Sequence, residues 1–357
     1  MRCFLFLLVP TLLLAQRPNT NFDETKVGKS PLPGVFGSAK TSQDWPARRA
    51  EILKLYETHV FGRIIDQKIA TKTEQTAKGP NWKQIRFTFS GNGREKSVTT
   101  LLVIPPKAKK PVPVVICLSF TPIQTVLDGH TRWPLDLFAK YGYAVFTAHY
   151  TDFFPDVKDG LPNSVLALMP ENNAPDAPNA ISAWAWGMSR MLDYAQTEKD
   201  LDPKRIAVAG HSRLGKAALW AGAADTRFAA VISNNSGEGG AALSRRIFGE
   251  HIADLNKSFP HWFNTNFKGF SQSVEELPVD SHMLLALAAP RPLYVASASD
   301  DLWADPMGEL MGLTEANRVY EMLGVPERTG YHLRPGKHNI TAYDWERFLR
   351  FLNNTLK

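Results

Sequence analysis

The chain has 357 residues, of which 44% are hydrophobic and 21% charged, so it is long enough to bury a large core and has an ordinary globular balance. Its formal net charge is +6, and its basic residues are distributed along the chain without long runs; the densest basic cluster is KAKK at 107–110. Because nucleic-acid-binding surfaces concentrate Lys and Arg in patches, this distribution disfavours a nucleic-acid partner. A mildly basic surface would still attract an acidic polysaccharide at long range.

The first fifteen residues, MRCFLFLLVPTLLLA, have the pattern of a secretory signal peptide. One arginine precedes an apolar stretch that is too short to span a bilayer, although a buried N-terminal strand is the alternative. We therefore expect a secreted or periplasmic protein whose mature chain, 16–357, is a single catalytic domain with an irregular segment up to about Lys40. Cys3 would leave with the signal, so Cys117 would remain alone as a buried, inert thiol, and no disulfide could form within the chain.

Short apolar runs alternate with stretches of helical spacing along the rest of the chain. The continuous Val, Ile and Ala runs in the middle suit strands that are buried on both faces of a parallel sheet. The alternation predicts a doubly wound α/β sheet, in which ligands bind beyond the carboxyl ends of the strands. Helices are expected at Trp45–His59, Trp133–Tyr141, Ala180–Gln196, Gly215–Ala224, Glu309–Leu323 and Ala342–Lys357. Strands are expected at Ile85–Ser90, Val98–Ile104, Val112–Ser119, Ala144–His149, Ile206–Ala209, Ala229–Ser233, Pro292–Ser297 and Tyr331–Arg334.

One stretch, AVAGHSRLGK at 207–216, has the strand–turn–helix context of a nucleophile elbow. Such a sharp turn exposes the Ser212 hydroxyl, and Gly210 allows the strand and the helix to approach closely. The helix amino end would offer free N–H groups to a developing oxyanion. The match to G-x-S-x-G is imperfect, because Leu214 holds the last position and Gly215 follows it. The alternative is that Ser212 is an ordinary helix N-cap.

A nucleophilic serine needs a base and an acid, which follow it in the order Asp/Glu and then His in α/β hydrolases. ASASDDLWADP follows one predicted strand and offers Asp300 or Asp301, and RPGKHNIT follows the last strand and offers His338. Taken singly, the aspartates could cap a turn and the histidine could be polar surface. Found in this order and at successive strand ends, the three groups predict a triad on an α/β-hydrolase fold, a three-layer αβα sandwich.

The elbow GHSRLGK resembles that of the glucuronoyl esterases of carbohydrate esterase family 15, including the displaced glycine. The resemblance extends through NNSGEGGAALSRRIFGEHI (234–252), FPHWFNTNF (259–267), SDDLWADPMGE (299–309) and GKHNIT (336–341). It implies hydrolysis of the ester that links (4-O-methyl)-glucuronic acid side chains of xylan to lignin alcohols. By this resemblance, the substrate of the enzyme would be glucuronoxylan or a lignin–carbohydrate ester. The reaction would need no cofactor and no metal. We expect a monomer, with no nucleic-acid partner and no membrane association after signal removal.

The same resemblance implies the roles of the triad. Ser212 corresponds to the nucleophile, His338 to the general base and Asp301 to the acid that bacterial members place after this strand. Fungal members carry a glutamate in the position that Asn235 occupies here, and an amide cannot replace that carboxylate. Glu238, three residues on, is a minor alternative acid.

Four further residues match positions that act on the substrate in this family. Arg213 corresponds to an arginine that stabilises the oxyanion. Lys216, one helical turn after the serine, could reach the sugar hydroxyls. Glu250 and Trp303 correspond to residues that hold the glucuronate ring. Without the resemblance, Arg213 and Lys216 could be solvated helix charges and Trp303 could belong to the core.

Three other readings of the sequence compete with this one. An acetyl-xylan or feruloyl esterase on the same fold would keep the triad but would not need the four additional residues. A secreted carbohydrate-binding protein without catalytic activity would not need Ser212, Asp301 and His338. A dinucleotide site at Gly237–Gly240 is disfavoured, because that run does not complete G-x-G-x-x-G.

Overall fold

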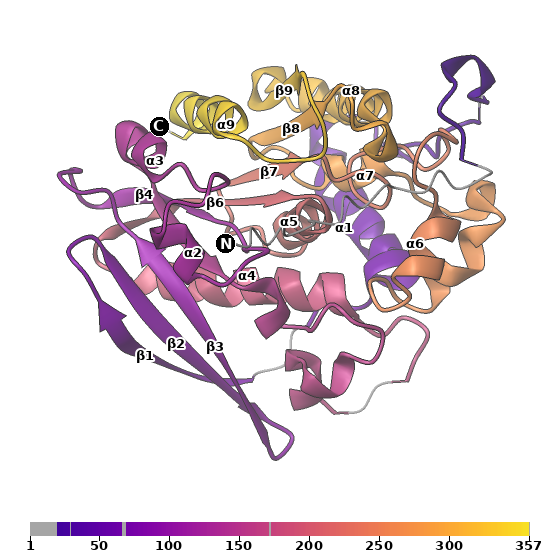
Figure 1. Cartoon of the computed structure of the whole chain (residues 1–357). Coiled ribbons are helices and arrows are strands. Elements are labelled where there is room, and N and C mark those ends of the chain that lie inside the picture. The colour runs from indigo at the N-terminus through magenta and orange to yellow at the C-terminus, as the bar shows by residue number, and fades with distance from the viewer. Residues whose placement is uncertain (1–19, 29, 66–68, 171–172, 357) are drawn as a thin grey trace, which may run out of the picture.

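The structure is a computed structural model that describes residues 20–28, 30–65, 69–170 and 173–356 (Figure 1). The predicted signal peptide and Cys3 lie outside the described residues. Cys117 lies inside them and is buried, and burial raises the pKa of its thiol to about 12, as expected for an unreactive cysteine. Among the described residues, no helix is both long enough and apolar enough to cross a membrane.

Nine strands form one sheet in the order β1-β2-β3-β5-β4-β6-β7-β8-β9. The strands from β5 across to β9 pair in parallel, whereas β1, β2 and β3 form an antiparallel extension that joins at β5. The bounds are β1 Ala70–Lys78, β2 Trp82–Gly91, β3 Arg94–Val103, β4 Val112–Ile116, β5 Ala144–Ala148, β6 Leu201–His211, β7 Ala230–Asn234, β8 Leu293–Ala298 and β9 Thr329–Arg334.

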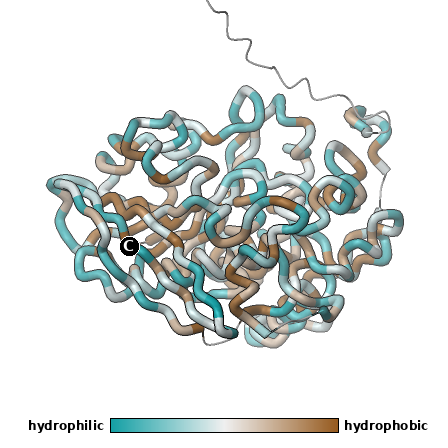
Figure 2. The backbone as a smooth tube through the Cα atoms, turned by 60° about the horizontal axis from the view of Figure 1, so that its bottom comes forward, coloured by the Kyte–Doolittle hydropathy of each residue, from teal (hydrophilic) through white to brown (hydrophobic). Residues whose placement is uncertain are grey.

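Helices cover both faces of the sheet and make the three layers of the sandwich (Figure 1). Alternate strand residues enter opposite cores: Val114 packs in the core that contains α4 and α5, and Val115 packs in the core that contains α3 and α9. Figure 2 shows the hydrophobic stretches running through the interior. The helices are α1 Trp45–Tyr56, α2 Gln124–Leu127, α3 Leu135–Tyr141, α4 Ala180–Thr197, α5 Arg213–Ala224, α6 Ile252–Ser258, α7 Ser281–Ala286, α8 Pro306–Met322 and α9 Ala342–Thr355.

The eight predicted strands and six predicted helices are all present, with ends that differ by a few residues. The predicted sheet omitted β1, because this strand reads ATKTEQTAK and is exposed over nearly its whole length, without the apolar alternation that marks a half-buried strand. The short helices α2, α6 and α7 were also not predicted. The structure confirms the α/β class and the mostly parallel sheet.

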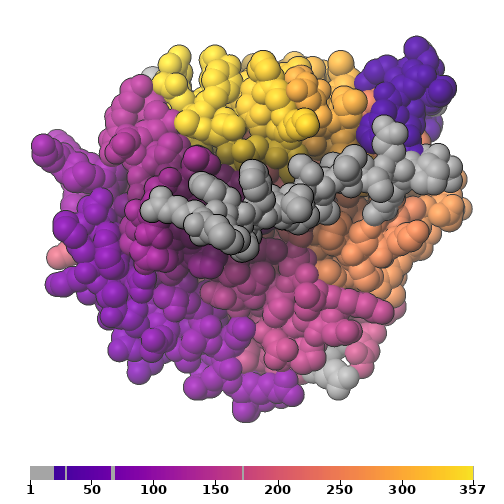
Figure 3. Space-filling view, viewed as in Figure 1, coloured from indigo at the N-terminus to yellow at the C-terminus, as the bar shows by residue number. Residues whose placement is uncertain are grey.

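The segment before α1 has only single 3-10 turns, as the sequence predicts for an irregular region, but it is firmly docked on the body of the protein. The Glu24 carboxylate pairs with Arg246, and Asn21 exchanges hydrogen bonds with the Ile247 carbonyl and the Gly249 N–H, both at 2.9 Å. Figure 3 shows this indigo segment lying against the orange part of the chain. It therefore supports the loop that ends at Glu250.

The turn from β6 into α5 depends on Gly210. A Cβ atom at this position would lie 1.9 Å from the Leu214 carbonyl oxygen, a distance at which backbone would have to move. We expect Gly210→Ala to lower the free energy of unfolding by about 3 kcal/mol or more, since overpacking against backbone cannot be relieved by a rotamer change. The matched control is Gly269→Ala, where a Cβ meets no heavy atom within 4 Å. Thermal unfolding of both variants checks this, and equal melting temperatures would contradict it.

Candidate active site

Ser212 occupies the turn between β6 and α5 in a strained conformation, with φ 58° and ψ −132°. Its N–H donates to the Asn234 carbonyl at 2.9 Å, and its carbonyl accepts from the N–H groups of Gly215 and Lys216, which closes the first helical turn. The Ser212 side chain makes no capping hydrogen bond to the helix. Ser212 thus occupies the N-cap position of α5 without capping the helix through its side chain, and its strained turn has the geometry of an elbow.

His338 and Asp301 lie together on the loops that follow β9 and β8. His338 Nδ1 is 2.6 Å from Asp301 Oδ2, and the Asp301 side chain is 5% exposed whereas that of His338 is 43% exposed. Asp300 is exposed and accepts a hydrogen bond from Ser299. Of the two candidate aspartates, the structure thus brings Asp301 to the histidine. With Nδ1 engaged, His338 has Nε2 available for a reacting group.

The His338 ring stands beside the elbow. It packs on the imidazole of His211, the residue before the serine, with ring centroids 4.5 Å apart. His211 Nδ1 donates to Asn234 Oδ1 at 2.7 Å. Burial, reinforced by the charges of His338 and Arg132, holds the pKa of His211 well below its usual value. His211 is thus a neutral, fixed surface under His338.

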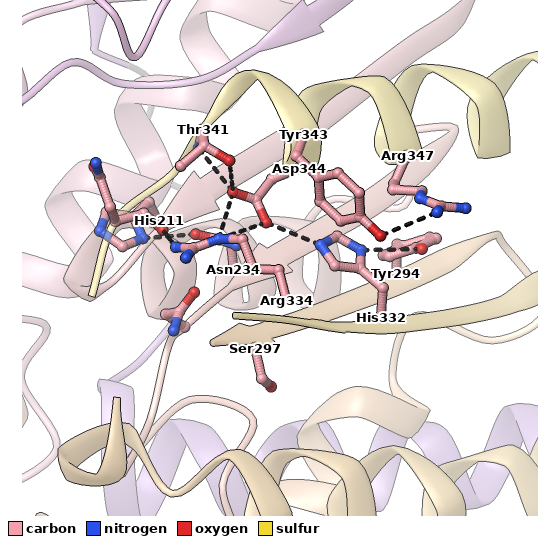
Figure 4. Close-up of polar contacts among 12 residues, drawn as sticks. His211, Asn234, Tyr294, Ser297, His332, Arg334, Thr341, Tyr343, Asp344 and Arg347 are labelled. Atoms are coloured by element: carbon pink, nitrogen blue, oxygen red, sulfur yellow. Dashed lines mark hydrogen bonds and ion pairs between the residues drawn. The ribbon is translucent and has the colours of Figure 1, made fainter. Parts of the chain in front are cut away.

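A buried ion pair holds the loop that carries His338 (Figure 4). Asp344 accepts from Arg334 Nε at 2.9 Å, from His332 Nε2 at 2.9 Å and from the Thr341 N–H at 2.7 Å. Arg334 Nη2 in turn donates to the carbonyls of Lys337 and Asn339, the two neighbours of His338 in the chain. Burial raises the pKa of Asp344, but these hydrogen bonds and the Arg334 charge lower it more, so the carboxylate stays ionised. The pair fixes the backbone on both sides of His338.

Asn235, in the fungal glutamate position, contacts the acid directly. Its Nδ2 donates to Asp301 Oδ2 at 2.7 Å, the same oxygen that faces His338. Asn235 adopts φ 46°, a left-handed conformation that asparagine tolerates better than most residues. The amide therefore supports Asp301 and does not replace it.

Arg213 begins α5 and points across the site to a carboxylate that the sequence did not indicate. Its Nη1 pairs with Asp156 Oδ2, and its guanidinium lies over the rings of Phe259, at 5.2 Å, and Trp262, at 4.7 Å. Asp156 comes from the loop after β5 and lies within DFFPDVKDG, which matches no motif. Only the fold brings it to Arg213.

Asp156 accepts four hydrogen bonds. Oδ1 accepts from His261 Nε2 at 2.9 Å and from Trp262 Nε1 at 2.8 Å, while Oδ2 accepts from the Tyr150 hydroxyl at 2.9 Å and from Arg213. Burial raises the pKa of Asp156, but the hydrogen bond from His261 and the Arg213 charge outweigh it and hold the pKa well below its usual value. Arg213 is therefore held by a permanent anion.

Lys216 and Glu250 form a second, buried charge pair. The Lys216 ammonium donates to the Ser236 carbonyl at 2.7 Å and lies 3.8 Å from Glu250 Oε2. Burial lowers the pKa of Lys216 and raises that of Glu250, and the attraction between them opposes both shifts. A hydrogen bond from Trp303 also favours the Glu250 carboxylate, and the Glu250 N–H donates to the Trp303 carbonyl at 2.9 Å. Lys216 is thus buried and is not a solvated helix charge. Trp303 is partly exposed and is therefore not a fully buried core residue.

Two more buried glutamates hold the loop after β7. Glu238, the minor alternative acid, accepts from the Ser244 hydroxyl at 2.5 Å and from the Gly239 N–H at 3.0 Å, and burial raises its pKa to about 8. Glu309 accepts from Ser297 at 2.6 Å and from the Gly237 N–H at 3.0 Å. The structure joins Asp301, not Glu238, to His338. Within the described residues, no group of three or more His, Cys, Asp or Glu is arranged to hold a metal ion.

The site therefore collects its groups from loops at the carboxyl ends of parallel strands, where a doubly wound sheet places its ligands. Asp156 follows β5, Ser212 follows β6, Asn235 follows β7, Asp301 follows β8 and His338 follows β9. A serine at a strained elbow beside an Asp–His pair on an α/β-hydrolase fold is the arrangement of a serine hydrolase.

Comparison with known proteins identifies the family. The chain is 36% identical to carbohydrate esterase MZ0003 of an unknown prokaryotic organism, over 95% of this chain and 93% of that protein. It superposes on a glucuronoyl esterase from Solibacter usitatus with a TM-score of 0.87 at 36% identity, covering 93% of this chain and all of the other. A glucuronoyl esterase from Teredinibacter turnerae gives a TM-score of 0.83 at 31% identity, over 95% and 93% of the two chains. The chain belongs to the glucuronoyl esterases of carbohydrate esterase family 15.

A family model described as "Glucuronyl esterase, fungi" matches residues 167–324, which include Ser212 and Asp301. The 4-O-methyl-glucuronoyl methylesterase of Schizophyllum commune is 28% identical over 89% of this chain and 80% of its own length. The resemblance inferred from the motifs and the predicted fold class are thus both confirmed.

The contact between Asn235 and Asp301 gives a prediction about pH. Asn235→Asp would place a second carboxylate beside Asp301, and two close anions share protons and favour a protonated histidine. We expect the acid limb of the pH–rate profile to move to higher pH, with turnover reduced at and below neutral pH. Asn353→Asp, at an exposed site on α9, is the matched control and should leave the profile in place. An unmoved acid limb in Asn235→Asp would argue against this role for the amide.

Proposed function

We propose that this enzyme hydrolyses the ester between (4-O-methyl)-glucuronic acid side chains of xylan and lignin alcohols. The observation that carries the proposal is the 2.6 Å contact between His338 and Asp301 beside the Ser212 elbow, next to the paired cations Arg213 and Lys216. The names of the relatives, glucuronoyl esterase and 4-O-methyl-glucuronoyl methylesterase, support the substrate class.

In the proposed acylation step, each of the three groups has its own role. His338 Nε2 removes the Ser212 proton while Oγ attacks the uronate carbonyl carbon, and Asp301 holds the imidazole in the required tautomer and stabilises the imidazolium. When the tetrahedral intermediate collapses, the bond to the alcohol oxygen breaks, and His338 returns the proton to that oxygen. A water molecule then attacks the glucuronoyl-serine by the same proton transfers and releases the free acid.

The oxyanion of the intermediate would meet the Arg213 side chain and the N–H groups at the start of α5 that precede Gly215, since those of Gly215 and Lys216 donate to the Ser212 carbonyl. One such donor typically lowers the barrier by about 3–4 kcal/mol. Lys216, Glu250 and Trp303 would hold the glucuronate ring, with the charged pair bonded to hydroxyls and the indole against the ring. No step requires a metal or a cofactor.

A broader esterase activity is the second candidate, because a neighbour with a TM-score of 0.86 and 34% identity is described as a promiscuous esterase of this family. Acetyl or feruloyl esters of xylan would use the same Ser212, His338 and Asp301. They lack the uronate ring and would not engage Lys216, Glu250 and Trp303.

We also propose that the enzyme is exported, as the signal-like sequence 1–15 suggests, and that the mature chain acts as a monomeric single domain. The single buried thiol Cys117 among the described residues is compatible with an oxidising compartment.

Substrate preference provides the first test. We expect rapid hydrolysis of benzyl glucuronate and much slower hydrolysis of p-nitrophenyl acetate, because only the former carries the sugar ring that the site would hold. Initial rates on both esters, with Ser212→Ala as the inactive control, check this. Activity on the acetate alone would overturn the proposed substrate.

The two adjacent aspartates provide the second test. Asp301→Asn should lower kcat on benzyl glucuronate by about 10²–10⁴-fold, because the amide fixes the wrong histidine tautomer. Asp300→Asn is the matched control, since this side chain is exposed and is expected to leave kcat within about twofold of the original value. Near-normal turnover of Asp301→Asn would show that another carboxylate supports His338.

A further inference from the structure

Each cation of the site is held by its own buried carboxylate. Asp156, with a side chain 7% exposed, pairs with Arg213, and Glu250, with a side chain 10% exposed, pairs with Lys216. The charge of the partly exposed guanidinium and that of the buried ammonium are therefore each balanced by a carboxylate of the protein.

This balance matters because the proposed reaction changes the charge of the bound molecule. The ester is neutral, the tetrahedral intermediate carries a localised oxyanion, and the released uronic acid carries a diffusible carboxylate. Unbalanced cations would attract that carboxylate more strongly than the neutral ester and would retain the product. Hydrogen bonds act at contact distance, whereas net charge acts over several ångströms. An arginine whose charge is offset by a neighbouring carboxylate can thus stabilise an oxyanion by hydrogen bonds without strongly binding an anion from solution.

We propose that Asp156 is a positioning residue that fixes the Arg213 guanidinium and cancels its charge, so that the site discriminates the ester from the free uronic acid. This inference rests on the proposed function, since it assigns Arg213 to the oxyanion.

The contacts of Asp156 are suited both to fixing the Arg213 guanidinium and to cancelling its charge. Each of its oxygens accepts two hydrogen bonds, so the carboxylate has no freedom to rotate. Arg213 is bound at Nη1, and its guanidinium lies over the Phe259 and Trp262 rings, which together favour one position of the side chain. Its Nε has no hydrogen-bond partner within the described part of the chain. That N–H is buried, so the exposed part of the guanidinium, on a side chain that is 27% exposed, is what could meet a reacting group while Asp156 balances the charge.

The decisive variant is Asp156→Asn, which keeps the size of the side chain and removes its charge. We expect free glucuronate to inhibit the hydrolysis of benzyl glucuronate about tenfold more strongly than in the original enzyme, because one cation is now unbalanced. Inhibition by methyl glucoside, which has a similar ring and no carboxylate, should not change. An unchanged inhibition constant for glucuronate would overturn the proposal, even if kcat falls.

Two matched variants separate charge from structure. Asp159→Asn removes a charge from the same loop at an exposed position, and Tyr150→Phe removes one hydrogen bond to Asp156 but leaves its charge. Both should keep the inhibition constant within about twofold. A tenfold strengthening in either one would contradict a role specific to the Asp156 charge.

A measurement on the unaltered enzyme covers the case in which Asp156→Asn does not fold. If the cations are balanced, inhibition by glucuronate should be weak and nearly independent of NaCl concentration. A steep loss of inhibition with added salt would contradict the proposal. Failure of the enzyme to hydrolyse benzyl glucuronate would instead reject the proposed function, whereas an active enzyme with unchanged inhibition in Asp156→Asn rejects only this inference.

Discussion

The contact between His338 and Asp301 is the interaction on which the rest of the site depends, because it joins the loops after two neighbouring strands. Backbone bonds make the same connection: the Ser299 N–H donates to the Arg334 carbonyl at 2.9 Å, and the Asp300 N–H donates to the Gly336 carbonyl at 3.0 Å. Parallel pairing of β8 with β9 brings these loop starts to one edge of the sheet. The imidazole is thus placed by sheet register as well as by its own hydrogen bond, which limits the conformational entropy lost in ordering it.

Around this contact, buried charged side chains of the described residues are paired, as Asp344 and Lys216 illustrate. Asp344 is fully buried, yet it faces Arg334, His332 and Thr341, and Lys216 faces both Glu250 and a backbone carbonyl. Such arrangements add little net stability, because desolvation offsets much of the attraction, but breaking one partner is costly. Their effect is to allow a single geometry for the loops that bear the reacting groups.

How far the sequence could predict this arrangement depends on the kind of signal each part leaves. Buried strands and long helices follow from apolar periodicity, and the elbow follows from Gly210, Ser212 and the helix behind them. Asn235 and Asp156 leave no such signal, because their roles come from contacts with residues 66 and 57 positions away in the chain. Spacing alone left Asp300 and Asp301 equivalent and only the family resemblance favoured Asp301; the structure agrees, because the backbone turns Asp301 toward His338 and Asp300 to solvent.

The strain at Ser212 persists because neighbouring elements fix its backbone. A left-handed φ at a serine is unfavourable, and no side-chain hydrogen bond to the helix compensates for it. Its backbone is instead fixed on both sides, by the Asn234 carbonyl in the neighbouring strand and by the first turn of α5. Asn234 also accepts from His211, the surface on which the His338 ring rests. One strand end thus holds the Ser212 backbone and, through a neutral imidazole, the His338 ring, so the strain of the elbow and the placement of this histidine depend on the same strand.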